Sequence, residues 1–195
     1  MIIFLVIIGI VFIVFQSFMS ISTSSIEKQQ YRVVKKETGF EIRYYPSATL
    51  ATIKSTAKSY RELSSNGFRR IAGYIFGNNE SSSKIAMTSP VHMDFSKENT
   101  SMSFVMPSKY DIHQLPKPYD AKIEIHQTAP EYVAAIEFGG YANDNNIQKY
   151  SMLLSKYLQE KNIKAIGNFR YLGYNPPYQL IGRKNEIIVA IDWKE

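Results

Sequence analysis

The sequence predicts an α+β domain in which an antiparallel sheet or open barrel is packed by one helix from each half of the chain. Segments that alternate like strands surround two segments with helical periodicity, and this order occurs twice. Short motifs also recur at a spacing of roughly 84 residues, namely Glu41-Ile42 with Glu124-Ile125, Ser103 to Val105 with Ile187 to Val189, and Pro90 with Pro176. Two copies of one strand–helix–strand module explain these observations together.

The first half of the folded part begins with strands. Residues 31–55 alternate as three short strands, two of them around Thr38-Gly39 and the third after Pro46. A helix is then predicted, because five apolar residues follow its i, i+3, i+4, i+7, i+8 spacing: Phe68, Ile71, Ala72, Ile75 and Phe76. Gly77 is a typical stop signal for this helix. Residues 84–95 and 100–107 predict a hairpin around the polar residues 96–99.

The second half repeats this order after a connector in residues 108–120, which contains two prolines. Residues 121–138 read as two strands separated by Pro130. A second helical stripe, with Asn143 or Asp144 as its N-cap, consists of Ile147, Ser151, Leu154 and Leu158. Residues 169–178 and 185–193 predict the last two strands.

The N-terminus differs from the rest of the chain, because residues 1–22 contain no charge and Ile2 to Phe15 are almost wholly apolar. A helix of about 20 residues crosses a bilayer. No Lys or Arg precedes the apolar run, and the small-x-small pattern at Ser20 to Ser22 is weak. The sequence therefore favours an uncleaved transmembrane anchor over a cleaved signal peptide.

Residues 23–30 are polar and serine-rich, and we expect them to form a short tether to a folded domain in residues 31–195. The side of the membrane stays open. Basic residues directly after the apolar segment favour the cytoplasmic side under the positive-inside rule, whereas a signal anchor would export the domain.

Composition narrows the function classes. A length of 195 residues suits one domain, and a net charge of +6 is compatible with anionic partners. Lys and Arg occur only singly or in pairs, so no nucleic-acid-binding stripe is predicted. The absence of cysteine excludes disulfides, thiolate metal sites and a Cys nucleophile. Nucleotide-binding and hydrolase motifs are also missing, so the sequence makes no positive case for an enzyme.

The histidines and methionines do not form a predicted metal site. His92, His113 and His126 fall on different predicted elements. Glu124 and His126 share a strand face and could perform acid–base chemistry, but a polar strand surface is the simpler interpretation. The hairpin carries a cluster of methionines that are more typical of core or pocket lining than of metal ligands: Met87, Met93, Met102 and Met106. At a strand period of two, His92 and Met93 face opposite sides.

Four stretches taken together resemble the SOUL haem-binding protein family: "FEIRYYPSATLATI", "KIAMTSPVHMDF", "FGGYAND" and "GYNPPYQLIGRKNEIIVAI". The resemblance runs from about Tyr31 to Trp193. It implies a distorted antiparallel barrel of two βαβββ-type pseudo-repeats with two packed helices. It also implies non-covalent binding of haem or another tetrapyrrole, as a carrier or buffer.

The resemblance further implies which residues would contact haem. Some family members have an axial His where this chain has Tyr44, and a tyrosinate can ligate ferric haem, although an unperturbed Tyr is protonated at neutral pH. The apolar cleft beside the first helix and the Pro-Pro loop corresponds here to Phe68, Ala72, Tyr178 and Gln179. Gln179 replaces a basic residue that would pair with a propionate, and the replacements that could supply this charge are Arg61, Arg69 and Arg183.

Two other function classes stay open at this point. The same fold could bind other amphiphiles or a protein partner without any role for haem. An enzyme acting on a tetrapyrrole or small molecule would have Glu124 and His126 as its best candidates.

Overall fold

The structure is a computed structural model that describes Ile7, residues 26–95 and residues 100–194. Apart from Ile7, the expected anchor in residues 1–22 lies outside the described residues, and so does the start of the expected tether. The polar residues 96–99 inside the predicted hairpin also lie outside them. Within the described part of the chain, no helix is both long and apolar enough to cross a membrane.

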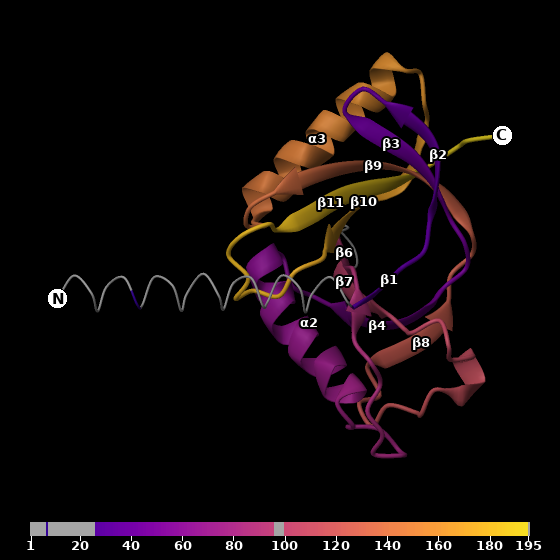
Figure 1. Cartoon of the computed structure of the whole chain (residues 1–195), viewed down its shortest axis with the longest axis vertical. Helices are drawn as coiled ribbons and strands as arrows, with labels where there is room; N and C mark the ends of the chain where they lie inside the picture. The colour runs from indigo at the N-terminus through magenta and orange to yellow at the C-terminus, as the bar shows by residue number, and fades with distance from the viewer. Residues whose placement is uncertain (1–6, 8–25, 96–99, 195) are drawn as a thin grey trace.

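The predicted α+β class is confirmed, because a large antiparallel sheet is packed by two helices (Figure 1). The helices are α2 (Tyr60–Ile75) and α3 (Asp144–Glu160). The nine strands, in their order across the sheet, are β2 (Arg32–Glu37), β3 (Phe40–Tyr45), β9 (Glu131–Gly139), β11 (Lys184–Ile191), β10 (Ala165–Gly173), β6 (Val91–Phe95), β7 (Thr100–Val105), β4 (Thr49–Ser55) and β8 (Ile123–Gln127). The described residues also form a parallel pair, β1 (Glu27–Lys28) with β5 (Thr88–Ser89), and a short 3-10 helix, η1 (Ile112–Gln114).

The sheet is open. Its edge strands are β2 and β8, and among the described residues no ladder joins them. The distorted antiparallel barrel that the resemblance implies is therefore not confirmed, since barrel closure requires every strand to have two neighbours. Both helices lie on one side of this sheet, α2 against β4 and β7, and α3 against β9, β10 and β11 (Figure 1).

The internal repeat stays a prediction, although the strand order is compatible with it. The corresponding strands of the two halves would be β3 with β8, β9 with β4, β11 with β7, and β10 with β6. These pairs are placed symmetrically about the centre of the eight strands, because the order read from β3 inward matches the order read from β8 inward. One of the recurring motifs does not correspond, because Pro90 directly precedes β6 whereas Pro176 follows β10.

Local sequence signals explain where the elements begin and end. Gly39 turns the β2–β3 hairpin at a φ of +91°, a conformation that glycine adopts without strain. Helix α2 begins after Ser59, whose hydroxyl accepts the backbone N–H of Glu62, and it ends just before Gly77. Helix α3 is capped by Asn143 rather than by Asp144.

The two faces of the sheet are different. Phe138 on β9 stacks on Tyr150 of α3, with ring centroids 4.3 Å apart, so alternate residues of β9 face the helix layer. The residues between them face the opposite side. A second, smaller apolar cluster lies on that opposite side and consists of Tyr45, Val133, Ala135, Leu172 and Ile188.

Candidate functional site

Helix α2 carries four of the residues that the sequence implicated in haem binding. Phe68 is half-buried and its ring lies 5.2 Å from that of Phe104 on β7, while Ala72 is buried. Arg61 and Arg69 are exposed. Most of the predicted apolar stripe is therefore buried, but Phe76 is not, because it caps the end of α2 and is 57% exposed. The two arginines are accessible on the same helix.

The loop between β10 and β11 carries the other predicted contacts. Gln179 is buried, and its Nε2 donates to the carbonyl of Ile181 at 3.0 Å. Arg183 Nη1 donates to the carbonyls of Pro176 and Gln179 at 2.8 and 2.7 Å. These side chains hold the loop together, so Gln179 contributes to its shape rather than to its surface.

The same loop exposes a group of large apolar side chains. Tyr178, Leu180 and Ile181 are 55%, 45% and 63% exposed. Arg183 lies over the ring of Tyr141, 4.6 Å from its centroid. We call the patch formed by Tyr141, Tyr178, Leu180 and Ile181 the loop patch. Exposed apolar groups that gather in this way mark interaction surfaces.

A chain of contacts connects the loop patch to the start of α2. Tyr141 lies two residues before Asn143, the N-cap of α3, and its carbonyl accepts from Asn146 Nδ2. The carboxylate of Asp144 accepts the backbone N–H of Tyr60 at 2.7 Å, so α2 and α3 begin side by side. Through Tyr141, the loop patch thus lies toward the end of the molecule where α2 starts, and Arg61 is the second residue of that helix. Phe68 is about two helical turns further along α2.

Tyr44 is placed apart from these residues. It lies on β3, where its ring is 5.2 Å from that of Tyr132 and 5.7 Å from the guanidinium of Arg32. Four strands separate β3 from β7, the strand against which Phe68 packs. The structure therefore does not bring Tyr44 together with the α2 residues.

The histidine and methionines of the predicted hairpin are structural. His92 is buried, and its Nε2 lies 2.7 Å from Oε1 of Gln29. Burial, aided by the charge of Arg170, lowers the pKa of His92 to about 3, so the ring is neutral and Nε2 donates to the amide oxygen. Met93 and Met102 are register partners in the core. Among the described residues, no group of three His, Asp or Glu side chains could hold a metal ion.

Glu124 and His126 each have a partner of their own. The Glu124 carboxylate pairs with Lys54 at 3.1 Å, and His126 Nε2 lies 3.0 Å from the hydroxyl of Thr52. Neither contact joins the two residues to each other, and this arrangement matches a polar strand surface.

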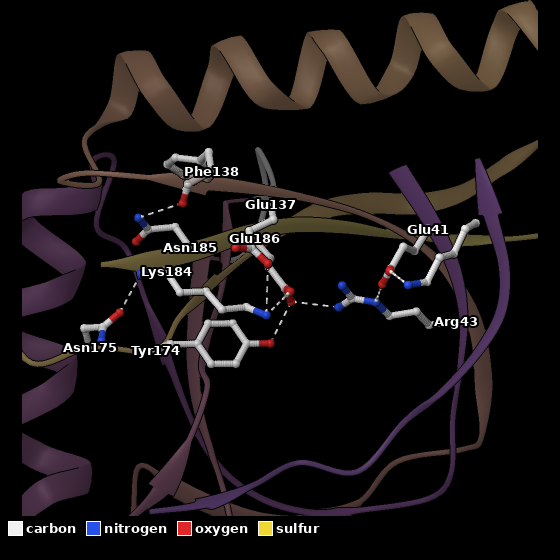
Figure 2. A network of polar contacts seen from close by, with 10 residues as sticks. Glu41, Arg43, Glu137, Phe138, Tyr174, Asn175, Lys184, Asn185 and Glu186 are labelled. Carbon is white, nitrogen blue, oxygen red and sulfur yellow. Dashed lines mark hydrogen bonds and ion pairs between the residues drawn. The ribbon is translucent and has the colours of Figure 1, made fainter. Parts of the chain in front are cut away.

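A polar network lies on the face of the sheet away from α3 (Figure 2). Its centre is Glu186 on β11, which is fully buried. The Glu186 carboxylate accepts from Arg43 Nη1 at 2.9 Å and from the Tyr174 hydroxyl at 2.6 Å, and Lys184 Nζ lies 2.9 Å away. Arg43 also pairs with Glu41 at 2.9 Å, and Lys184 with Glu137 at 3.1 Å.

The network controls the ionisation of Glu186. Burial alone would raise the pKa of this carboxyl, but the hydrogen bonds and charge of Arg43, together with the Tyr174 and Lys184 contacts, outweigh it and leave the pKa lowered. Burial and the neighbouring carboxylate raise the pKa of the Tyr174 hydroxyl. Glu186 and Arg43 thus form a buried ion pair in which both groups are charged.

Asn185 fixes the turn before α3. Its Oδ1 accepts from the buried Tyr171 hydroxyl at 2.7 Å, and its Nδ2 donates to the carbonyls of Gly140 and Phe138 at 2.9 and 3.3 Å. Sequence reasoning used Asn185 and Glu186 only as motif residues and did not single out Arg43. One sequence feature could have indicated a buried charge here: Glu186 stands directly before the apolar run of residues 187–191.

Comparison with models of known protein families identifies the family of this chain. The family model described as SOUL heme-binding protein matches residues 26–190. The chain belongs to the SOUL family. Heme-binding protein 1 of Xenopus laevis is 28% identical over 160 residues, which cover 78% of this chain and 84% of that protein. Heme-binding protein 2 of Homo sapiens is 28% identical over 156 residues, covering 76% of each chain.

Solved structures extend the comparison to the fold. The EcmrR C-terminal domain has a TM-score of 0.59 at 9% sequence identity, and the alignment covers 84% of this chain and 99% of that one. At this identity the likeness concerns the fold only. The resemblance stated from the sequence motifs is confirmed by the SOUL match. The matched range includes all the candidate haem contacts: Tyr44, Arg61, Phe68, Arg69, Ala72, Tyr178 and Gln179.

Proposed function

We propose that this SOUL protein binds haem or another tetrapyrrole without a covalent bond, at a surface formed by α2 and the loop patch, and that it acts as a haem carrier or buffer. Membership of a family described as heme-binding is the observation that carries this proposal. The loop patch supports the location, because it exposes three large apolar side chains between β10 and β11: Tyr178, Leu180 and Ile181.

Apolar burial and propionate pairing would supply the affinity. A flat macrocycle on the loop patch would remove apolar surface from water, which contributes about 25 cal/mol per Å². The exposed guanidinium groups of Arg61 and Arg69 suit carboxylates, because Arg pairs with them through two parallel hydrogen bonds. Arg183 is less available for this task, since it already bonds two loop carbonyls.

Ile181→Ser is expected to weaken hemin binding about fivefold, because losing half-exposed apolar contact area costs roughly 1 kcal/mol. The measurement is a Soret-band titration of the purified full-length protein with hemin. Met152→Ser is the matched control, because Met152 on α3 is 60% exposed and Ile181 is 63% exposed. The proposed location fails if the two variants lose equal affinity. The proposed function fails if the wild-type protein leaves the Soret band unchanged at micromolar concentration.

Tyr44→Phe is expected to leave the hemin spectrum and affinity unchanged, because Tyr44 packs on Tyr132 and lies apart from α2. A tyrosinate bound to ferric iron gives a characteristic charge-transfer absorption, so the visible spectrum of the hemin complex tests this directly. Loss of such a band in the variant would instead identify Tyr44 as the axial ligand that the family resemblance allowed.

A further inference from the structure

The chain that follows the predicted anchor is bound to the folded domain soon after the anchor ends. Strand β1 begins this segment and pairs in parallel with β5. The carboxylate of Glu27 accepts the backbone N–H of Ser108 at 2.8 Å, and the backbone N–H of Gln29 donates to the carbonyl of Ser89 at 2.8 Å. We call residues 27–31 the N-terminal strap. These contacts fix the place where the chain enters the domain.

The N-terminal strap lies on the face of the sheet away from α3. The amide oxygen of Gln29 lies 2.7 Å from Nε2 of His92, and His92 points to the side opposite its core neighbour Met93. Tyr31 packs on the smaller apolar cluster of that face, with its ring 5.2 Å from the ring of Tyr45. The outer surface of α3 therefore faces the opposite way.

The part of the tether that precedes the N-terminal strap is short. The predicted anchor ends at Ser22, and even a fully extended chain from Ser22 to Glu27 spans at most roughly 18 Å. A single domain of this size has a radius of gyration of roughly 15 Å, so its diameter exceeds the length of this connection. An anchor in the bilayer would therefore hold the surface around Glu27 close to the membrane and prevent the domain from turning freely.

The strap surface, which we define as residues 27–28 and 108–111, suits a lipid–water interface. Lys109 is exposed, and its ammonium lies 4.9 Å from the centre of the Tyr110 ring. Long basic and aromatic side chains favour the headgroup layer, because their apolar parts and their polar tips can lie in different surroundings. The exposed charges of the strap surface balance each other: Glu27, Lys28, Lys109 and Asp111. This surface therefore has no excess charge that would select anionic lipids.

We propose that the strap surface lies against the phospholipid headgroups of the membrane that holds the anchor, and that the short tether, rather than lipid charge, keeps it there. The outer surface of α3 then points away from the bilayer, because α3 packs on the other face of the sheet. This inference rests on the anchor predicted in residues 1–22 and does not depend on haem binding.

A fluorophore on a single introduced cysteine tests the proposal, because the chain contains no cysteine of its own. Lys109→Cys and Lys149→Cys are a matched pair, since each lysine is exposed and lies over the ring of the tyrosine that follows it, at 4.9 and 5.4 Å. Lys149 is on α3. Each labelled full-length protein is reconstituted into phosphatidylcholine vesicles that contain a lipid with a nitroxide quencher on its headgroup. Quenching is expected to be at least about twofold stronger at position 109, which the short tether holds near the headgroups.

A longer tether should abolish the difference between the two labels. About 20 Gly and Ser residues inserted after Ser22 would let the domain move roughly 25 Å further from the bilayer. Adding phosphatidylserine should leave the difference unchanged, because the exposed charges of the strap surface balance.

Four results would overturn the proposal: equal quenching of the two labels, quenching at position 109 only when phosphatidylserine is present, an unchanged difference after the insertion, or extraction of the protein from the vesicles by sodium carbonate. None of these results bears on the hemin titration, so this proposal and the proposed function can fail separately.

Discussion

Arg43→Met is expected to lower the free energy of unfolding by about 3–5 kcal/mol, because it removes one partner of a buried ion pair. Arg43 and Glu186 lie 143 residues apart in the sequence, on β3 and β11, and both side chains are almost completely buried. Without Arg43, the Glu186 carboxylate would keep the Tyr174 hydroxyl and a shared Lys184. Urea denaturation of the purified protein at pH 7 measures the loss.

Two comparisons make this prediction specific. Arg70→Met breaks the Arg70–Asp120 pair, whose side chains are 36% and 22% exposed, and we expect a loss of about 1 kcal/mol or less. The double variant Arg43→Met/Glu186→Gln should recover much of the stability, because no unpaired charge is left buried. Equal losses for Arg43→Met and Arg70→Met would show that the Glu186 pair is not the buried element described above.

Lowering the pH should reduce the difference in the free energy of unfolding between the wild-type protein and Arg43→Met. The folded-state pKa of Glu186 is lowered from an ordinary value of 4.5, so its contribution is fully present above that pH and is lost as the pH falls toward the lowered pKa. In the variant, we expect burial without Arg43 to raise the pKa of Glu186. Protonation then removes the cost of burying an unpaired negative charge, so the variant loses less stability in acid than the wild-type protein. Urea denaturation of both proteins at several pH values between 7 and 3 measures how the difference in their free energies of unfolding changes.

Asn185→Ala is expected to cost about 3 kcal/mol, because it removes three hydrogen bonds, one from the Tyr171 hydroxyl and two to the carbonyls of Phe138 and Gly140. Asn146→Ala is the control. Its amide makes one exposed hydrogen bond to the Tyr141 carbonyl, and we expect a loss below about 1 kcal/mol. Thermal and urea unfolding provide both values.

A double-mutant cycle identifies the mechanism. Tyr171→Phe should cost less in the Asn185→Ala background than in wild type, because the hydrogen bond between Tyr171 and Asn185 is already lost there, and the coupling should be about 1 kcal/mol. Additive losses would mean that the hydrogen bond between Tyr171 and Asn185 does not contribute, and that Asn185 acts through its other contacts.

The sequence by itself determined the class of fold, the type of each main element and the family. These features depend on local signals: the apolar stripe of α2, the Asn143 cap region of α3 and the Thr38-Gly39 turn are each encoded within a few residues. The family motifs are likewise contiguous stretches, so they could be read without coordinates. The N-terminal anchor stays a prediction from residues 1–22.

Only the tertiary structure decided how distant residues meet. Closure of the sheet would require the edge strands β2 and β8 to pair with each other, and no local sequence pattern specifies such long-range pairing. In the described residues they do not pair, so the sheet is open. Tyr44 and Phe68 are implied together by the family, yet the strand order separates them. Gln179 is buried, and its side chain bonds within its own loop. The network of Arg43 and Glu186 arises from the same cause: long-range strand pairing brings their charges together, and burial makes that contact strong.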